Sequence, residues 1–181
     1  MIDYEREYIR KKFESDFANF LYRLKQYKNS YEIVFLCVGT DRITGDCLGP
    51  IVGTKLTKFL KNSNLSYIDV YGNLEENLSY QNIEKKLEKI NTNACIVVID
   101  AALSKKENIG KIFVTSKKTI LGKGLNKTKI ELGDISIKVV VEKDSKIPNH
   151  NFKILQNTSL NKVINLSEIV SDGIINVLQN S

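Results

Sequence analysis

The fold of this chain is decided by residues 35–50, which read FLCVGTDRITGDCLGP. The apolar run over residues 33–38 is typical of a buried strand, and the glycine after it ends that strand. A polar loop with two aspartates, Asp41 and Asp46, comes next, and from Leu48 the pattern is that of a helix. In a parallel α/β sheet, the loop after a strand lines the crevice where ligands bind. The stretch therefore predicts a strand–loop–helix unit that brings carboxylates to such a crevice.

A second apolar run, over residues 94–99, also ends on a carboxylate, Asp100. Asp46 and Asp100 can therefore be interpreted as a pair that polarises water, moves a proton or holds a metal ion. Two close carboxylates have their pKa values pushed apart, which gives one acid and one base near neutral pH. Carboxylate oxygens also suit a hard or borderline divalent metal. The structural alternatives are that Asp46 caps the following helix and that Asp100 bonds the backbone of its own loop.

The rest of the chain predicts helices and strands in alternation, followed by a less regular second half. We expect helices over 3–28, 48–60 and 79–90 and one capped by Ser167, and strands over 33–38, 66–71, 94–100, 111–115, 135–141 and, weakly, 152–156. We expect loops over 101–108 and 142–151. The βαβαβ order of the first hundred residues calls for a parallel sheet. With 181 residues, the chain is expected to form one α/β domain over 1–181, with a leading amphipathic helix in 1–30.

Three polar loops are candidates for substrate binding. In the first loop, Gly39, Thr40 and Gly45 could present backbone amides to an anion, although the spacing matches no nucleotide-binding motif. Glu75 lies in a loop after the second predicted strand. The third loop could supply amide donors or a cation to an oxyanion, or could be an ordinary turn. Its candidate residues are Gly122, Gly124, Asn126 and Lys127.

Composition limits the class of protein and its partners. The net charge is +6 with lysines spread over the chain, which indicates a solvated lysine surface more than an acidic or nucleic-acid partner, since no aromatic stripe accompanies them. No apolar run approaches the roughly 20 residues that cross a bilayer, and the first residues form no signal peptide. Three cysteines, two of them inside predicted strands, favour a reducing, cytoplasmic setting. The leading helix packs on the sheet or forms the face of a homo-oligomer.

Several motifs resemble one known family, the YyaC-type sporulation proteins (DUF1256), which are candidate spore proteases. The longest is the run from Leu36 to Leu56. Shorter matches are Val70-Tyr-Gly-Asn-Leu-Glu-Glu76, Val98-Ile-Asp-Ala101, Gly122-x-Gly-x-Asn-Lys127, Gly133-Asp-Ile-Ser-Ile137 and Leu155-Gln-Asn-Thr158. That family is similar to germination protease, which degrades small acid-soluble spore proteins, and to the hydrogenase-maturation endopeptidases.

The resemblance implies a fold, an activity and a site. The fold is a three-layer α/β sandwich with a mostly parallel central sheet, of the phosphorylase/hydrolase-like kind. The activity is that of a sporulation or germination endopeptidase acting on a peptide or small spore protein in the forespore or spore core. Asp46 and Asp100 match the two essential aspartates of germination protease, and Asp41 and Glu75 would be further acids. In the hydrogenase-maturation enzymes the equivalent acids bind metal together with a histidine, for which this chain offers no counterpart, so a divalent metal on Asp46 and Asp100 stays open.

Two rival functions use the same residues. One is a catalytically inactive sporulation factor that binds a peptide or protein partner in the same crevice. The other is a phosphate- or nucleotide-binding module. Fold alone does not decide among them.

Overall fold

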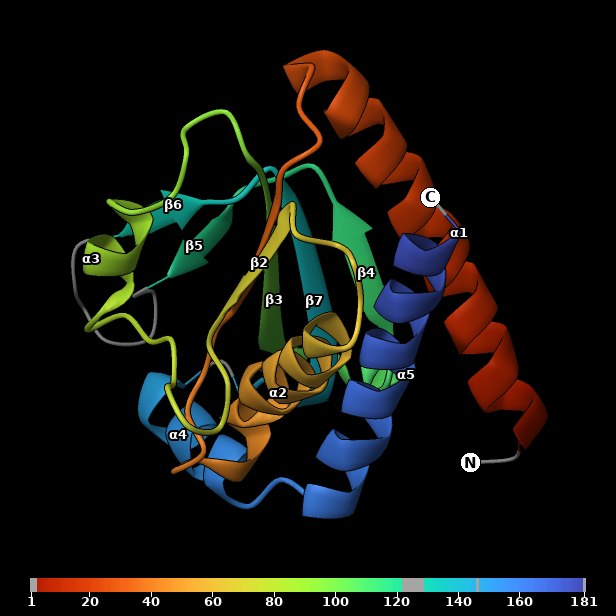
Figure 1. Cartoon of the computed structure of the whole chain (residues 1–181). Helices are drawn as coiled ribbons and strands as arrows, with labels where there is room; N and C mark the ends of the chain where they lie inside the picture. Colours follow the sequence, from red (N-terminus) through yellow and green to blue (C-terminus); the bar gives the residue numbers. More distant parts are fainter. Residues whose placement is uncertain (1–2, 122–128, 146, 181) are drawn as a thin grey trace.

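The computed structural model describes residues 3–121, 129–145 and 147–180, and Figure 1 shows its arrangement. A central sheet is covered on one face by long helices and on the other by smaller elements. In chain order the elements are α1 (Asp3–Lys28), β1 (Ile33–Cys37), η1 (Thr44–Asp46), α2 (Leu48–Lys61), β2 (Ile68–Tyr71), α3 (Ile83–Leu87), β3 (Cys95–Ser104), η2 (Lys106–Asn108), β4 (Ile112–Thr115), β5 (Thr119–Leu121), β6 (Ile130–Leu132), β7 (Ile135–Lys143), α4 (Pro148–Gln156) and α5 (Leu160–Gln179). The mostly parallel α/β sandwich predicted from the sequence is confirmed.

The central sheet has the strand order β2-β1-β3-β7-β4. The pairs β1–β2, β1–β3 and β3–β7 are parallel, and β4 runs antiparallel to β7 at one edge. All five residues of β1 are buried, as expected for an inner strand with both faces covered. Because the four parallel strands point the same way, the loops after β1, β2 and β3 leave the same end of the sheet.

The helical face carries α1, α2 and α5, which pack over the larger hydrophobic core. In Figure 1, α1 and α5 lie side by side, so the first and last helices of the chain form one layer. Phe13 and Phe17 are buried on α1 with their rings stacked at 5.9 Å, and Phe17 also contacts Phe35 of β1. The leading helix therefore packs into the core, as one of its two predicted roles required.

The opposite face is thinner and holds a second, smaller core. Here α3 and a two-stranded antiparallel sheet, β5–β6, cover the strands. The Thr119 and Ser136 hydroxyls, both buried, hydrogen-bond each other at 2.6 Å and join β5 to β7. This small sheet was not predicted.

Three boundaries predicted around this face are wrong. The helix expected over 79–90 is reduced to α3, because Asn82 Oδ1 accepts the Ser79 N–H and holds residues 79–82 in a turn. The strand expected to end at Asp100 continues to Ser104, because β7 keeps pairing with it beyond the end of β1. Residues 101–104 are therefore strand and not loop.

The predicted C-terminal elements also differ. The loop expected over 142–151 is shorter, because β7 continues to Lys143 and helix α4, with a proline in its first turn, begins at residue 148. Residues 152–156 belong to this helix and not to the weak strand predicted there. The last helix begins at Leu160, and Ser159 caps it by accepting the Lys162 N–H. Ser167, the predicted cap, is buried in mid-helix and donates its hydroxyl to the Val163 carbonyl at 2.7 Å.

None of the helices in the described part of the chain has the length and apolar character needed to cross a bilayer.

Candidate functional site

The two predicted aspartates come together where β1 ends beside β3. The last pair between these strands is Cys37 with Ile99, and the Val38 N–H still donates to the Ile99 carbonyl at 2.9 Å. Beyond that point β1 turns away while β3 continues with Asp100. The loop from β1 then returns through η1, whose last residue is Asp46. The end of β1 thus leaves the space into which both carboxylates are brought.

A glycine makes this turn feasible. Gly39 has a φ of 140°, and a Cβ added there would lie 2.0 Å from the main-chain oxygen of Asp46. Its N–H donates to the Leu78 carbonyl at 2.8 Å, which ties the loop to the segment after β2. The next N–H, of Thr40, donates to Asp46 Oδ2 at 3.1 Å. Sequence and backbone together therefore fix the position of the Asp46 carboxylate.

Asp46 and Asp100 line one cavity of about 630 Å³. Its walls come from the loop after β1, from the segment after β2 and from α4. The lining residues are Val38, Gly39, Thr40, Arg42, Ile43, Asp46, Asn77, Ser79, Tyr80, Gln81, Asn82, Asp100, Leu121, Phe152 and Gln156. Amide and hydroxyl side chains make up about half of the lining, and Phe152 is 50% exposed. The cavity therefore offers polar side chains that can hydrogen-bond a peptide main chain next to two carboxylates.

Burial changes the acidity of both carboxyls. Burial raises the pKa of Asp46 to about 6, against the opposing hydrogen bond from the Thr40 N–H. Burial raises the pKa of Asp100 to about 7, the negative charge of Asp46 raises it further, and Lys138 and the Ala101 N–H oppose the rise. Because the two groups interact, these values describe the pair. Near neutral pH the pair can hold one proton, which is the state that an acid–base device requires.

Of the other predicted site residues, some line the cavity and some do not. Gly39 and Thr40 line the cavity, whereas Asp41 is exposed and accepts a hydrogen bond from Asn77 Nδ2 at 2.6 Å. Gly45 is buried, and an added Cβ would lie 2.8 Å from the Leu155 side chain, so it serves the packing of η1 under α4.

Glu75 lies outside the cavity lining. It is exposed in a turn in which Asn73 Oδ1 accepts its N–H at 2.8 Å. Gly122, Gly124, Asn126 and Lys127 lie outside the described residues.

Sequence reasoning missed the segment after β2 and the contribution of α4. Residues 77–82 supply five of the lining side chains, and their run of amides and hydroxyls inside a predicted amphipathic helix was the available signal. Phe152 and Gln156 were assigned to a weak strand, and no local pattern pointed to the cavity. Both omissions concern segments that only the tertiary fold brings to the aspartates.

The donor set does not fit a resident metal of the zinc type. Among the residues described, no group of three His, Cys, Asp or Glu side chains is placed to share an ion, and the segment 122–128 contains none of these residue types. Structural and catalytic zinc sites take at least three such ligands. Asp46 and Asp100 alone supply two carboxylates, which is fewer protein ligands than such a site takes.

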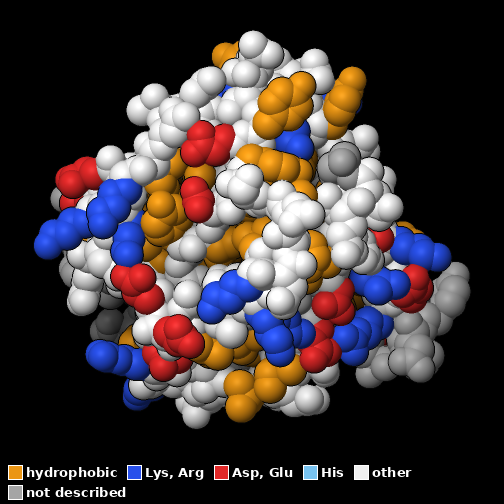
Figure 2. Space-filling model, in the orientation of Figure 1, with side chains coloured by type: hydrophobic (Ala, Val, Ile, Leu, Met, Phe, Trp, Pro, Cys, Tyr) orange, Lys and Arg blue, Asp and Glu red, His pale blue; other side chains and the backbone are white. Residues whose placement is uncertain are grey.

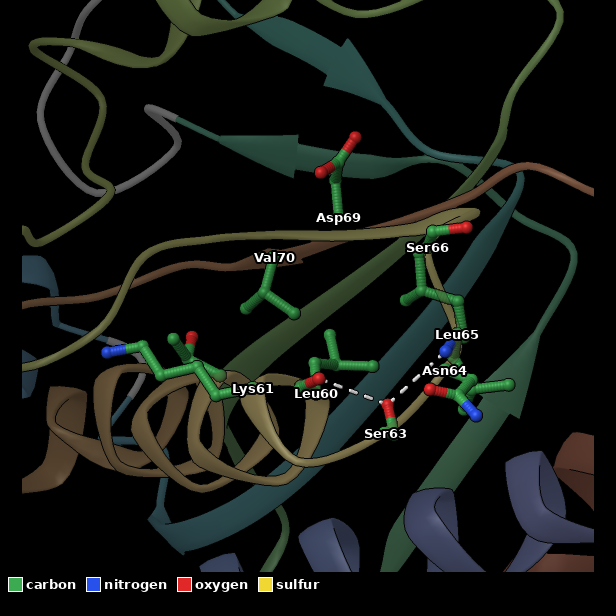
Figure 3. Close-up of a pocket in the computed structure, with 10 residues that line it drawn as sticks. Leu60, Lys61, Ser63, Asn64, Leu65, Ser66, Asp69 and Val70 are labelled. Carbon is green, nitrogen blue, oxygen red and sulfur yellow. Dashed lines mark hydrogen bonds between the residues drawn. The ribbon is translucent and has the colours of Figure 1, made fainter.

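A second hollow, of about 660 Å³, lies away from the aspartates. Figure 3 shows it between the last turn of α2 and β2. The Ser63 hydroxyl donates to the Leu60 carbonyl and accepts the Leu65 N–H, so this turn satisfies its own polar groups, and Asp69 points away from Val70 and the helix. This hollow therefore carries no comparable group of reactive side chains.

Charge on the surface is mixed. On the face in Figure 2, basic and acidic side chains alternate and do not gather into one basic patch. This agrees with the interpretation of the net charge of +6 as a solvated lysine surface.

Comparisons with known proteins place this fold and site in context. The profile of a family described as "Protein of unknown function (DUF1256)" matches residues 4–173. A Bacillus subtilis (strain 168) protein, "Uncharacterized protein YyaC", is 33% identical over 145 residues, which are 78% of this chain and 67% of that protein.

One solved structure with a related fold is a hydrogenase maturation protease. The structure of the [NiFe] hydrogenase maturation protease HycI from Thermococcus kodakarensis KOD1 matches with a TM-score of 0.53 and 15% identity, over 82% of this chain and 92% of that one. HybD of the same species matches with a TM-score of 0.41 and 15% identity, over 78% of this chain and 97% of that one. At such identity the likeness to HycI shows a shared fold, and the fold predicted from the resemblance is thereby confirmed.

Proposed function

This chain belongs to the DUF1256 family, as its motifs predicted, and we propose that it is an endopeptidase in which Asp46 and Asp100 act as an acid–base pair. The observation that carries the proposal is the pair itself. A carboxyl from η1, in the loop after β1, and one from the adjacent strand β3 line one cavity, and burial raises the pKa of each toward neutrality. Strongly perturbed carboxyls in a cleft are typical of catalytic sites.

The geometry supports different roles for the two aspartates. Each carboxyl accepts one main-chain N–H, from Thr40 for Asp46 and from Ala101 for Asp100, but the charge of Asp46 further raises the pKa of Asp100, so Asp46 ionises first. Asp46 then acts as the base and takes a proton from a water molecule. The oxygen of that water attacks the carbonyl carbon of the peptide bond, while Asp100 gives its proton to the carbonyl oxygen. Asp46 then gives the proton that it took to the amide nitrogen, and the C–N bond breaks. A hydroxyl of the intermediate returns its proton to Asp100, so the pair again holds one proton.

The cavity lining supports a peptide as the substrate. Amide side chains such as Asn77, Gln81 and Gln156 can pair with the donors and acceptors of an extended main chain. The half-exposed ring of Phe152 offers a surface for an apolar side chain. The resemblance to germination protease makes small spore proteins the first substrates to test, with sporulation as the process and the forespore cytoplasm as the location.

The experiment compares wild type with Asp46→Asn and Asp100→Asn on small acid-soluble spore proteins and on a peptide library prepared from a proteome. Asp69→Asn is the matched control, because this exposed aspartate on β2 lies outside the cavity. Mass spectrometry should find cleavage by wild type and control, and a loss of at least about 1000-fold in both site variants. Equal cleavage by wild type and Asp100→Asn, or none by any form, would contradict the proposal. A parallel series with a chelator decides whether a divalent metal takes part.

A non-catalytic peptide-binding factor is the second candidate, and the half-exposed Phe152 in a cavity rich in amides favours it. In that case a peptide binds without turnover, and binding survives the Asp100→Asn change. Binding of the same library to wild type and Asp100→Asn therefore separates the two functions.

A further inference from the structure

We propose that Lys138 is a positioning residue of the aspartate pair, because it is the cation that lies opposite Asp100 in the sheet. The inference rests on the proposed function for its role in hydrolysis. Its electrostatic content can be measured in the protein without substrate.

The strand register places Lys138. In the parallel pair β3–β7, Asp100 is directly opposite Lys138. Neighbouring strands lie about 4.8 Å apart and residues in register project to the same face. That face is the one carrying the smaller core, since Val98, two residues before Asp100, belongs to it, and Ser136, two residues before Lys138, bonds Thr119 of β5. Lys138 and Asp100 therefore lie side by side on the face that carries the smaller core. They are two residues further along their strands than Val98 and Ser136, which β5–β6 covers.

No other acid competes for the charge of Lys138. It is half-buried, and within the described residues no carboxylate oxygen lies within 4.0 Å of its Nζ. Its neighbour on the other side, in the antiparallel pair β4–β7, is Phe113. Other partly buried lysines differ, since Lys28 and Lys162 each contact a carboxylate at 2.7 Å. Asp100 is the acid opposite Lys138 in the register, and the charge of Lys138 acts on it without a direct ion pair.

The charge of Lys138 acts in the direction that the chemistry needs. The charged groups that act on Asp100 are Asp46 from η1 and Lys138 from β7, and the other titratable side chains of the cavity lining are Arg42, which is exposed, and Tyr80. Asp46 and burial raise the pKa of Asp100, whereas Lys138 lowers it. A singly protonated pair together with Lys138 is neutral overall, so the buried site avoids a net charge in its working state. The same cation stabilises the negative charge that develops during attack on the peptide bond.

The test uses Lys138→Met, Lys138→Gln, Lys138→Arg and a control, Lys143→Met. The control removes the same charge from an exposed position on the same strand, which pairs with Ser104 and lies beyond the pair. Carboxyl carbon NMR of the substrate-free protein should show the apparent pKa of Asp100 raised by on the order of one pH unit in Lys138→Met and Lys138→Gln. Lys138→Arg and Lys143→Met should titrate close to wild type, because Arg keeps the charge and solvent screens Lys143. Assignment of the carbon signal comes from its loss in Asp100→Asn.

Cleavage provides the second readout. The alkaline limb of the pH–rate profile should move upward by the same amount in Lys138→Met and return toward wild type in Lys138→Arg. An unchanged Asp100 titration in folded Lys138→Met or Lys138→Gln, or an equal shift in Lys143→Met, overturns the inference. Absence of cleavage by every form would contradict the proposed function alone, since the NMR titration still decides the role of Lys138.

Discussion

The two ends of the central sheet treat their carboxylates in opposite ways. At the amino end, Asp134 contacts Lys28 Nζ at 2.7 Å and accepts the Ile96 N–H at 2.9 Å, while Lys28 also donates to the Ala94 carbonyl at 2.6 Å. At the carboxyl end, Asp46 and Asp100 receive main-chain N–H groups but no cation within 4.0 Å among the described residues.

The difference indicates that the paired carboxylate at the amino end stabilises the fold, whereas the two carboxyls at the carboxyl end are available for proton exchange. A carboxylate that has both a cation and a main-chain donor as partners is held in place. The pair of Asp134 with Lys28 joins the end of α1 to the start of β3. Two partly buried carboxyls without a close cation cost stability when both ionise. Such a cost is retained where a proton must be exchanged.

The largest expected effect breaks the geometry of the carboxyl end. Gly39→Ala combines a φ of 140° with a Cβ 2.0 Å from the main-chain oxygen of Asp46. We expect a loss of about 3 kcal/mol in the free energy of unfolding, measured by urea denaturation, together with lost cleavage. Gly110→Ala is the control, because Gly110 has a φ of 85° and nothing within 4 Å of an added Cβ. It should cost about 1 kcal/mol, and equal losses in the two variants would show that the contact with Asp46 is unimportant.

A smaller effect breaks the paired amino end. Lys28→Met removes the ion pair with Asp134 and the hydrogen bond to Ala94, and should lower the free energy of unfolding by about 2 kcal/mol, below the cost for a fully buried pair because the side chains are 15% and 27% exposed. Lys58→Met, in the last turn of α2, removes the same charge from an exposed site and should change stability by less than about 0.5 kcal/mol. A loss in Lys28→Met no larger than in this control would place Asp134 in the same class as a surface charge. Peptide cleavage by Lys28→Met should be unchanged at a temperature where it is folded.

The smallest effect has the opposite sign and depends on pH. Burial raises the pKa of Asp100 from 3.8 to about 7, so its contribution to stability is fully present below pH 3.8 and is lost as pH rises through 7. Asp100→Asn cannot ionise, and it should therefore be more stable than wild type by about 1–2 kcal/mol at pH 5 and by less than about 1 kcal/mol at pH 4, since each pH unit between the two pKa values corresponds to about 1.4 kcal/mol.

Urea denaturation at both pH values checks this prediction. Asp69→Asn should show a flat difference from wild type, since this carboxyl is exposed. If Asp100→Asn is less stable than wild type at pH 5, partners hold Asp100 in its ionised form, and Asp100 is not a proton-exchanging group.

The sequence predicted the strands and helices whose apolar residues repeat within a short stretch of the chain. The buried strands β1 and β3 and helices α1 and α2 were recognised because apolar runs and helical spacing lie within a few residues. The extension of β3 to Ser104 depends on pairing with β7, almost forty residues later, and so no window along the chain contains it. The α4 helix has nine residues, too few for its spacing to be distinguished from a short strand.

The site divides along the same line. Asp46 and Asp100 were predicted because Asp46 lies in the polar loop between an apolar run and a helix and Asp100 directly ends a second apolar run. The wall from residues 77–82 and the neighbour Lys138 were missed, because strand order and register decide which distant residues reach the aspartates. Glu75 was included because it also follows a strand, but its turn directs it away from the cavity.

The packing of α1 on α5 has a consequence for the order of folding. The Arg6–Glu168 ion pair and the hydrogen bond between Asn176 and Glu14 join segments 162 residues apart. During synthesis, Phe13 and Phe17 emerge early but gain this cover only after α5 has been made. Contacts between such distant segments slow folding, because a long loop must close before they form. The sheet and the aspartate cavity can thus form before the helical layer closes, and α5 is the helix whose packing closes this layer.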